Sequence, residues 1–120
     1  MEEYDLIWLA GLMEGEGSFK APLPSNPLEP IMSVQMKDED VIARVAQLWG
    51  VKYHLRPPRE SHHAVTYSVR LKGMKAVEIM RHLHPHMGIR RQAQIERAIQ
   101  GFVARPRWGQ KITQAQAREI

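Results

Sequence analysis

Residues Leu9–Phe19 read LAGLMEGEGSF, and this short stretch decides the fold. It continues an apolar run that begins at Ile7, so a helix over residues 4–15 has no polar side along that run. Gly11 and Gly15 are four residues apart and share one side of the helix, where missing side chains let another helix approach closely. Such a helix is expected to pack on its own sheet with one side and on a second copy of the chain with the other. The interface side is expected to carry Ile7, Ala10, Gly11, Glu14 and Gly15.

The residues that follow predict strand pairs alternating with helices. The expected elements are strands at 18–22 and 31–37, a helix capped by Asp38 and closed by Gly50, strands at 51–56 and 64–72, a helix from Gly73 to about Pro85, and a last helix at 89–104. Apolar residues at helical spacing predict the buried sides, namely Val41, Val45 and Leu48, then Ala76, Val77, Met80 and Leu83, then Ile95, Ala98, Ile99 and Phe102. The pattern predicts an α+β fold in which helices cover one face of an antiparallel sheet.

Alternation along the strands separates an apolar face from a basic one. The apolar face is expected to hold Phe19, Ala21, Met32, Val34, Met36, Val51, Tyr53, Leu55, Val65, Tyr67, Val69 and Leu71. The opposite face is expected to hold Ser18, Lys20, Ser33, Gln35, Lys37, Lys52, His54, Arg56, Thr66, Ser68, Arg70 and Lys72. A solvated face normally mixes charges of both signs, whereas this face has no carboxylate. Lysine and arginine among small polar side chains are typical of a surface that binds nucleic acid.

Composition limits the remaining possibilities. The chain has 120 residues, a net charge of +4 and a pI near 9.7, which suits one domain with a polyanionic partner. It has no cysteine, so disulfides and thiolate zinc sites are excluded. The group His82, His84 and His86 leaves a transition-metal site as a minor alternative, because Pro85 interrupts it. Neither a signal peptide nor a membrane-spanning run is present, so we expect a soluble cytoplasmic protein without membrane or small-molecule partners.

The stretch at residues 9–17 resembles the signature of the LAGLIDADG homing endonucleases. Leu9, Ala10, Gly11, Leu12 and Gly17 match the signature, and Glu14 and Glu16 occupy its two acidic positions. The resemblance extends over nearly the whole chain, since the expected order of elements is similar to the αββαββα core of that family. It implies a curved sheet that lies in the major groove of double-stranded DNA. It also implies that the protein is located in the cytoplasm of a bacterial or phage-infected host cell, although a location in an organelle is an open alternative.

The two acidic residues lie at the C-terminal end of the expected helix, where carboxylates are unfavourable. In a two-fold dimer two Glu16 side chains come together, and a divalent cation is the simplest agent to relieve their repulsion. Oxygen ligands of this kind favour Mg²⁺ or Mn²⁺. The resemblance implies that Glu16 binds the catalytic metal, helped by the backbone carbonyl of Gly15. Glutamate at both acidic positions departs from the aspartate that is usual in the family.

The resemblance implies further residues near the reacting phosphate. The family has a basic residue near the start of its late helix, and Arg90 and Arg91 both fit that position. A polar residue after the second strand orders water in the family, and this role suits Asp38 or Gln35, although Asp38 alone is equally explained as a helix cap.

A single motif implies a homodimer that makes a staggered double-strand break at a long, roughly palindromic DNA site. Two alternatives are a regulator that binds DNA without cutting it and an RNA-splicing maturase. We expect the endonuclease domain to span residues 1–105. Residues 106–120 are similar to the first helix of a small helix-turn-helix module, and their abrupt end indicates a piece of a longer chain.

Overall fold

The computed structural model describes residues 1–21, 30–58, 60 and 64–103. The expected tail at 106–120 lies outside the described residues, as does the connection at 22–29 between the first two strands. The elements, in chain order, are α1 (Glu3–Glu16), β1 (Gly17–Lys20), β2 (Ile31–Met36), α2 (Glu39–Trp49), β3 (Tyr53–Arg56), β4 (Thr66–Lys72), α3 (Gly73–Leu83), the short 3-10 helix η1 (His84–His86) and α4 (Ile89–Val103). This order confirms the predicted one.

The four strands form one antiparallel sheet in the order β1-β2-β4-β3. Phe19 pairs with Met32, which pairs with Leu71, and this row faces the helices. The neighbouring row, Ser18, Ser33 and Arg70, faces the other way. The sheet therefore has one apolar and one polar face, as the alternation predicts.

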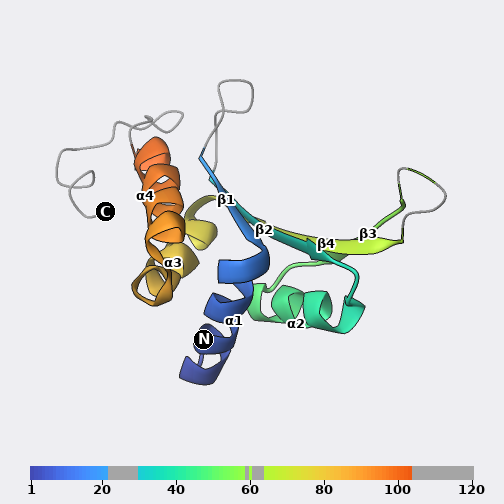
Figure 1. Ribbon diagram of the computed structural model, residues 1–120. Coiled ribbons are helices and arrows are strands. Elements are labelled where there is room, and N and C mark those ends of the chain that lie inside the picture. The colour runs from blue at the N-terminus through green and yellow to red at the C-terminus, as the bar shows by residue number, and fades with distance from the viewer. Residues whose placement is uncertain (22–29, 59, 61–63, 104–120) are drawn as a thin grey trace.

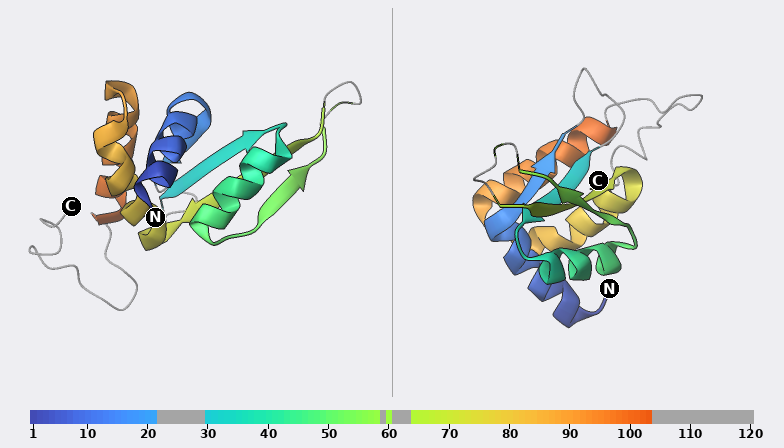
Figure 2. Two further views of the ribbon diagram at one scale, coloured as in Figure 1. Left: turned by 90° about the horizontal axis from the view of Figure 1, so that it is seen from below. Right: turned by 90° about the vertical axis from the view of Figure 1, so that its right-hand side faces the viewer.

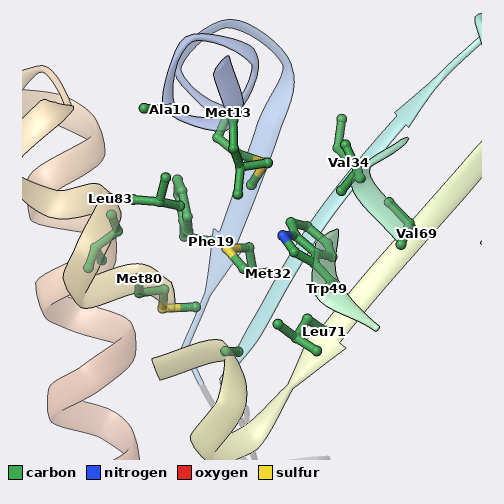
Figure 3. Packing of buried hydrophobic residues seen from close by; sticks show 14 of the residues in the cluster. Ala10, Met13, Phe19, Met32, Val34, Trp49, Val69, Leu71, Met80 and Leu83 are labelled. Carbon is green, nitrogen blue, oxygen red and sulfur yellow. The ribbon is translucent and has the colours of Figure 1, made fainter. Parts of the chain in front are cut away.

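The helices cover the apolar face and leave the polar face open (Figures 1 and 2). Helix α2 packs under β2 and β4, while α3 and α4 lie beside α1 and β1. Trp49, Met32 and Met80 are fully buried where these layers meet, and Figure 3 shows the packing around them. The predicted buried sides of α3 and α4 are confirmed. Gly50 closes α2 in the left-handed conformation that favours glycine.

Two details of the core differ from the sequence prediction. Leu55 and Val65 were expected in the core but are 56% and 39% exposed. Leu55 is in the outer part of β3 and Val65 directly precedes β4, and this end of the sheet extends beyond the helix beneath it (Figure 1). On α2 the buried side consists of Ile42, Val45, Ala46 and Trp49. The predicted Val41 and Leu48 are only half-buried, since the helix is rotated so that the large Trp49 ring is enclosed.

Gly17 makes the abrupt change from α1 to β1 possible. It is buried, and a Cβ atom placed on it would lie 2.8 Å from the Met13 carbonyl oxygen and 2.9 Å from the Met13 Cα. Both contacts are with backbone atoms, which cannot move aside as a flexible side chain can. The last glycine of the signature is therefore required by packing at the point where helix turns into strand.

Replacing Gly17 by Ala should lower the free energy of unfolding by about 1–3 kcal/mol, the usual cost of overpacking a core. Urea denaturation of the variants and the original chain at one fixed protein concentration measures this change. Gln47→Ala is the control, because Gln47 is exposed on α2 and its truncation leaves the core unchanged. Equal losses in the two variants would contradict the steric explanation.

Candidate functional site

The polar face of the sheet forms an open groove of about 820 Å³. Its walls are formed by Lys20, Ser33, Val34, Gln35, Lys37, Arg56, Pro57, Pro58, Ala64, Thr66, Ser68 and Arg70. The described residues that line it include cations but no carboxylate. A concave surface with charges of one sign concentrates ligands of the opposite sign.

Two hydrogen bonds between neighbouring strands order the groove. The Arg56 Nε donates to the Ser68 Oγ at 2.9 Å, and the Gln35 Nε2 donates to the Thr66 Oγ1 at 2.8 Å. The terminal amino groups of Arg56 make no further contact with the described part of the chain. They remain free for the paired hydrogen bonds that arginine makes with phosphate or with a base edge.

The groove includes most of the predicted polar face but not all of it. Lys52, His54 and Lys72 are exposed yet lie outside the groove, and Lys52 precedes β3 instead of belonging to it. Ser18 is half-buried and also lies outside it. Ser68 is only 6% exposed, so its hydroxyl serves to orient Arg56. Pro57 and Pro58, which follow β3, and Ala64, which precedes β4, were not predicted, because none of them is a polar strand residue.

Glu16 is the last residue of α1 and directly precedes the strand that carries Lys20 into the groove. Its side chain is exposed and makes no hydrogen bond or ion pair with the described residues. The last carbonyls of a helix lack partners within the helix. The carbonyl of Gly15 is one of them, so two oxygen donors of the kind that Mg²⁺ and Mn²⁺ prefer are available at this helix end.

The Glu14 side chain reaches the start of α4 within the same chain. Its Oε1 accepts a hydrogen bond from the Gly88 N–H at 2.6 Å, just before α4 begins. The Arg91 Nε donates to the Glu14 carbonyl oxygen at 3.1 Å. The Glu14 side chain remains 41% exposed, so the assignment of Glu14 to a dimer interface stays a prediction.

The other predicted site residues are separated by the structure. Arg91 is 7% exposed and directed at the end of α1, whereas Arg90 is exposed at the start of α4. Gln35 lines the groove. Asp38 is at the N-cap position of α2, but its side chain makes no capping hydrogen bond.

One side of α1 carries an exposed stripe that we call the α1 stripe, formed by Tyr4, Ile7, Gly11 and Gly15. Tyr4 is 85% and Ile7 52% exposed, and a Cβ on either glycine would meet nothing within 4 Å. Ala10 was expected on this side but is only 4% exposed and packs in the chain's own core (Figure 3). Neighbouring residues of a helix point in directions about 100° apart, so Ala10 faces the core while Gly11 faces outward. Tyr4 was missed, although its spacing of three residues before Ile7 signals the same side.

Two titratable side chains outside these regions, His84 and Tyr53, have partners within the chain. The His84 Nε2 lies 3.1 Å from the Glu96 Oε1. Among the residues that the structure describes, no three His, Asp or Glu side chains are grouped so that they could hold a metal ion. The Tyr53 hydroxyl donates to the Glu39 Oε2 at 3.0 Å, and this hydrogen bond raises the pKa of Tyr53 above its usual value. No helix in the described ranges has the length and apolarity needed to cross a bilayer.

Comparison with known proteins identifies the fold through structure alone. No protein-family profile matches the sequence, and no curated protein matches it significantly. One similar structure is the homing endonuclease I-CvuI in complex with the I-CreI target and Mg, in which the DNA is not cleaved. It aligns with a TM-score of 0.63 and 16% identity, and the alignment covers 85% of this chain and 70% of that one. The archaeal intron-encoded homing endonuclease I-Vdi141I, complexed with DNA, aligns with a TM-score of 0.61 and 15% identity. The alignment covers 84% of this chain and 69% of that one.

A third similar structure is the LAGLIDADG homing endonuclease I-SmaMI bound to cleaved DNA, with a TM-score of 0.56 and 16% identity. The alignment covers 96% of this chain but only 41% of that one. These neighbours are LAGLIDADG homing endonucleases, and the chain has their fold. The predicted α+β fold is confirmed.

Proposed function

We propose that this protein is a metal-dependent homing endonuclease that cuts both strands of DNA. The observation that carries the proposal is the free carboxylate of Glu16, which directly precedes a strand that lines a basic groove. The groove is suited to bind the DNA backbone and bases, and Glu16 is suited to hold a cation beside it. The DNA-bound homing endonucleases with the same fold support this assignment.

Two copies of the chain are needed for a double-strand break. The α1 stripe gives two helices a surface without bulky side chains along which to approach, and Tyr4 and Ile7 would lose their exposure in the contact. A two-fold dimer repeats each Glu16 and each groove, so its preferred target is a long, roughly palindromic site. Cutting at two related positions then gives a staggered break.

The residues divide the chemistry between binding and hydrolysis. Lys20, Lys37, Arg56 and Arg70 bind phosphates and base edges and fix the register of the DNA. Glu16 and the Gly15 carbonyl would hold Mg²⁺ or Mn²⁺, which supplies Lewis-acid stabilisation of charge on the phosphate. In the reaction water adds to phosphorus and the bond to the leaving oxygen breaks. Arg90, exposed at the start of α4, is the basic residue available to the phosphate, and Gln35 is available to orient water.

A selection from a randomised DNA library tests the proposal. The full chain is incubated with the library in Mg²⁺, and cut molecules are sequenced. We expect recovery of one long site with two-fold symmetry, and no recovery in excess chelator. Specific binding without cutting in either Mg²⁺ or Mn²⁺ would overturn the endonuclease in favour of a DNA-binding regulator, and preferential binding to structured RNA would favour a maturase.

Binding to any DNA duplex should weaken steeply as salt rises, since phosphate contacts release counterions. Replacing Lys20 and Arg70 together by Ala should reduce the slope of log K against log[salt] by about 3 to 4 for a dimer, because each lost contact contributes about 0.9. Fluorescence anisotropy with a random duplex at several salt concentrations measures this slope. Lys75→Ala is the matched control, because Lys75 is exposed on α3, away from the groove. An unchanged slope in the double variant would show that the DNA binds elsewhere.

A further inference from the structure

The end of α1 is held by two contacts from a segment more than seventy residues away. Glu14 accepts the Gly88 N–H at 2.6 Å, and Gly88 immediately precedes the first residue of α4. A Cβ on Gly88 would lie 3.3 Å from the Glu14 Oε1, so the two segments are in close contact. The Glu14 carboxylate thereby satisfies one of the free amides at the N-terminus of α4, where negative charge is favourable.

Arg91 makes the second contact and is almost completely enclosed. Its Nε donates to the Glu14 carbonyl oxygen at 3.1 Å, and its Nη1 donates to the Gln94 Oε1 at 2.9 Å. The Glu14 Oε2 lies 4.0 Å from the Arg91 Nε. With 7% of its surface exposed, Arg91 is directed into the chain and has little surface left for a DNA phosphate.

The bonds at the end of α1 leave the Gly15 and Glu16 carbonyls without a partner within the helix. The Gly17 N–H donates to the Met13 carbonyl, and Arg91 satisfies the Glu14 carbonyl. Arg91 therefore acts on the backbone one residue before the proposed metal-binding carbonyl and two residues before the proposed metal-binding side chain.

We infer that Arg91 is a positioning residue that fixes the end of α1, and with it Glu16, through the backbone and side chain of Glu14. This inference rests on the proposed endonuclease function and assigns Arg91 a different role from a phosphate contact. Arg91 and the N-terminus of α4 also supply positive charge beside the Glu14 carboxylate at a negative helix end. Replacing a group that orients a metal ligand in this way typically lowers metal affinity or activity by about 10- to 100-fold.

Four variants separate this role from the alternatives. Arg91→Met keeps the length of the side chain but removes its donors, while Arg91→Lys keeps the charge and one donor. Glu14→Gln keeps an oxygen acceptor for Gly88, and Glu14→Ala removes it. Arg97→Met is the matched control, because Arg97 is exposed on the same helix and makes no contact with the described residues.

The experiment measures cutting rate at saturating DNA, affinity for the selected site in metal-free buffer, and hydrogen exchange of the Gly88 amide without DNA or metal. For Arg91→Met we expect a cutting rate lower by about 10- to 100-fold with site affinity within about twofold of the original chain. Arg91→Lys and Glu14→Gln should recover part of the rate, which a loss of folding alone does not predict. Glu14→Ala should accelerate hydrogen exchange at the Gly88 amide, while Glu14→Gln should not. The double variant Glu14→Ala with Arg91→Met should lower the cutting rate by less than the product of the two single fold-changes.

The outcomes distinguish failure of this inference from failure of the proposed function. A parallel loss of affinity and cutting in Arg91→Met would make Arg91 a DNA contact and overturn the inference. Undiminished cutting by Arg91→Met, or unchanged exchange at Gly88 in Glu14→Ala, would overturn it as well. If the original chain binds the site but never cuts it, the proposed endonuclease function is refuted, and with it any positioning role of Arg91 in catalysis. The hydrogen-exchange data would still report whether the contact between Gly88 and Glu14 forms.

Discussion

Replacing Glu16 by Gln should abolish cleavage while leaving specific DNA binding within about twofold. The amide has nearly the volume of the carboxylate but lacks the charge that holds a divalent cation. Lewis-acid stabilisation is worth several kcal/mol in the transition state, and about 1.4 kcal/mol corresponds to a factor of ten, so we expect the rate to fall by about a thousandfold or more. The measurements are Mg²⁺-dependent cutting of the selected site and affinity for the same site in metal-free buffer.

The stability of the same variant tests the electrostatic part of the argument. A carboxylate at a helix C-terminus is unfavourable by about 0.3–1 kcal/mol, so Glu16→Gln should melt at the same or a slightly higher temperature without metal. Glu3→Gln is the control at the opposite end of α1, where the charge is favourable. It should cut normally and melt slightly lower. Retained cutting by Glu16→Gln would remove Glu16 as the metal ligand, and a large drop in its melting temperature would reveal a structural role.

Replacing Gly11 by Leu should turn a dimer into a monomer. Nothing in the chain lies within 4 Å of a Cβ at Gly11, so the fold itself accommodates the side chain. The same side chain obstructs the approach of a second α1 in both copies at once. Overpacking costs about 1–3 kcal/mol at each of the two sites, or about 2–6 kcal/mol in all, which raises the dimer dissociation constant by about thirtyfold or more. Sedimentation or light scattering at micromolar concentration measures the change, and double-strand cutting should be lost with the dimer.

Gln47→Leu provides the comparison, since Gln47 is exposed on α2 and lies outside the α1 stripe. It should remain dimeric. Because leucine favours helix over glycine by up to about 1 kcal/mol, the isolated Gly11→Leu subunit should be no less stable than the original subunit. A stable monomer of the original chain at micromolar concentration would contradict the dimer, and the argument for a palindromic site would be withdrawn with it.

The order of the elements was predictable because each depends on local pattern. The buried side of α3 follows from spacing within eleven residues, and Gly50 ends α2 through its own backbone conformation. Leu55 and Val65 could not be placed correctly, because alternation assigns a side of the strand without indicating where the helix beneath it ends. The buried side of α2 was misjudged for a related reason, since enclosure of the Trp49 ring depends on the whole core.

The candidate site was predictable to a similar extent. Alternation identified most of the cationic groove, whereas the signature named Glu16, whose role as a metal ligand stays a prediction. The burial of Ser68 depends on the register between β3 and β4, and the contact between Glu14 and Arg91 joins positions 77 residues apart in the sequence. Neither relation has a periodic signal, so both required the folded chain.

The strand order β1-β2-β4-β3 determines how a symmetric complex divides a DNA target among its strands. β1 directly follows α1, so in a dimer built on the α1 stripe β1 would be close to the symmetry axis and β3 would be farthest from it. The inner strands would then meet the central base pairs near the two cuts, and the β3-β4 hairpin would meet the flanks. Substitutions on the outer hairpin would then change flanking preferences without disturbing Glu16 or the turn at Gly17. In the proposed endonuclease, a change in the flanks of the target would therefore leave the residues at the centre of the complex unchanged.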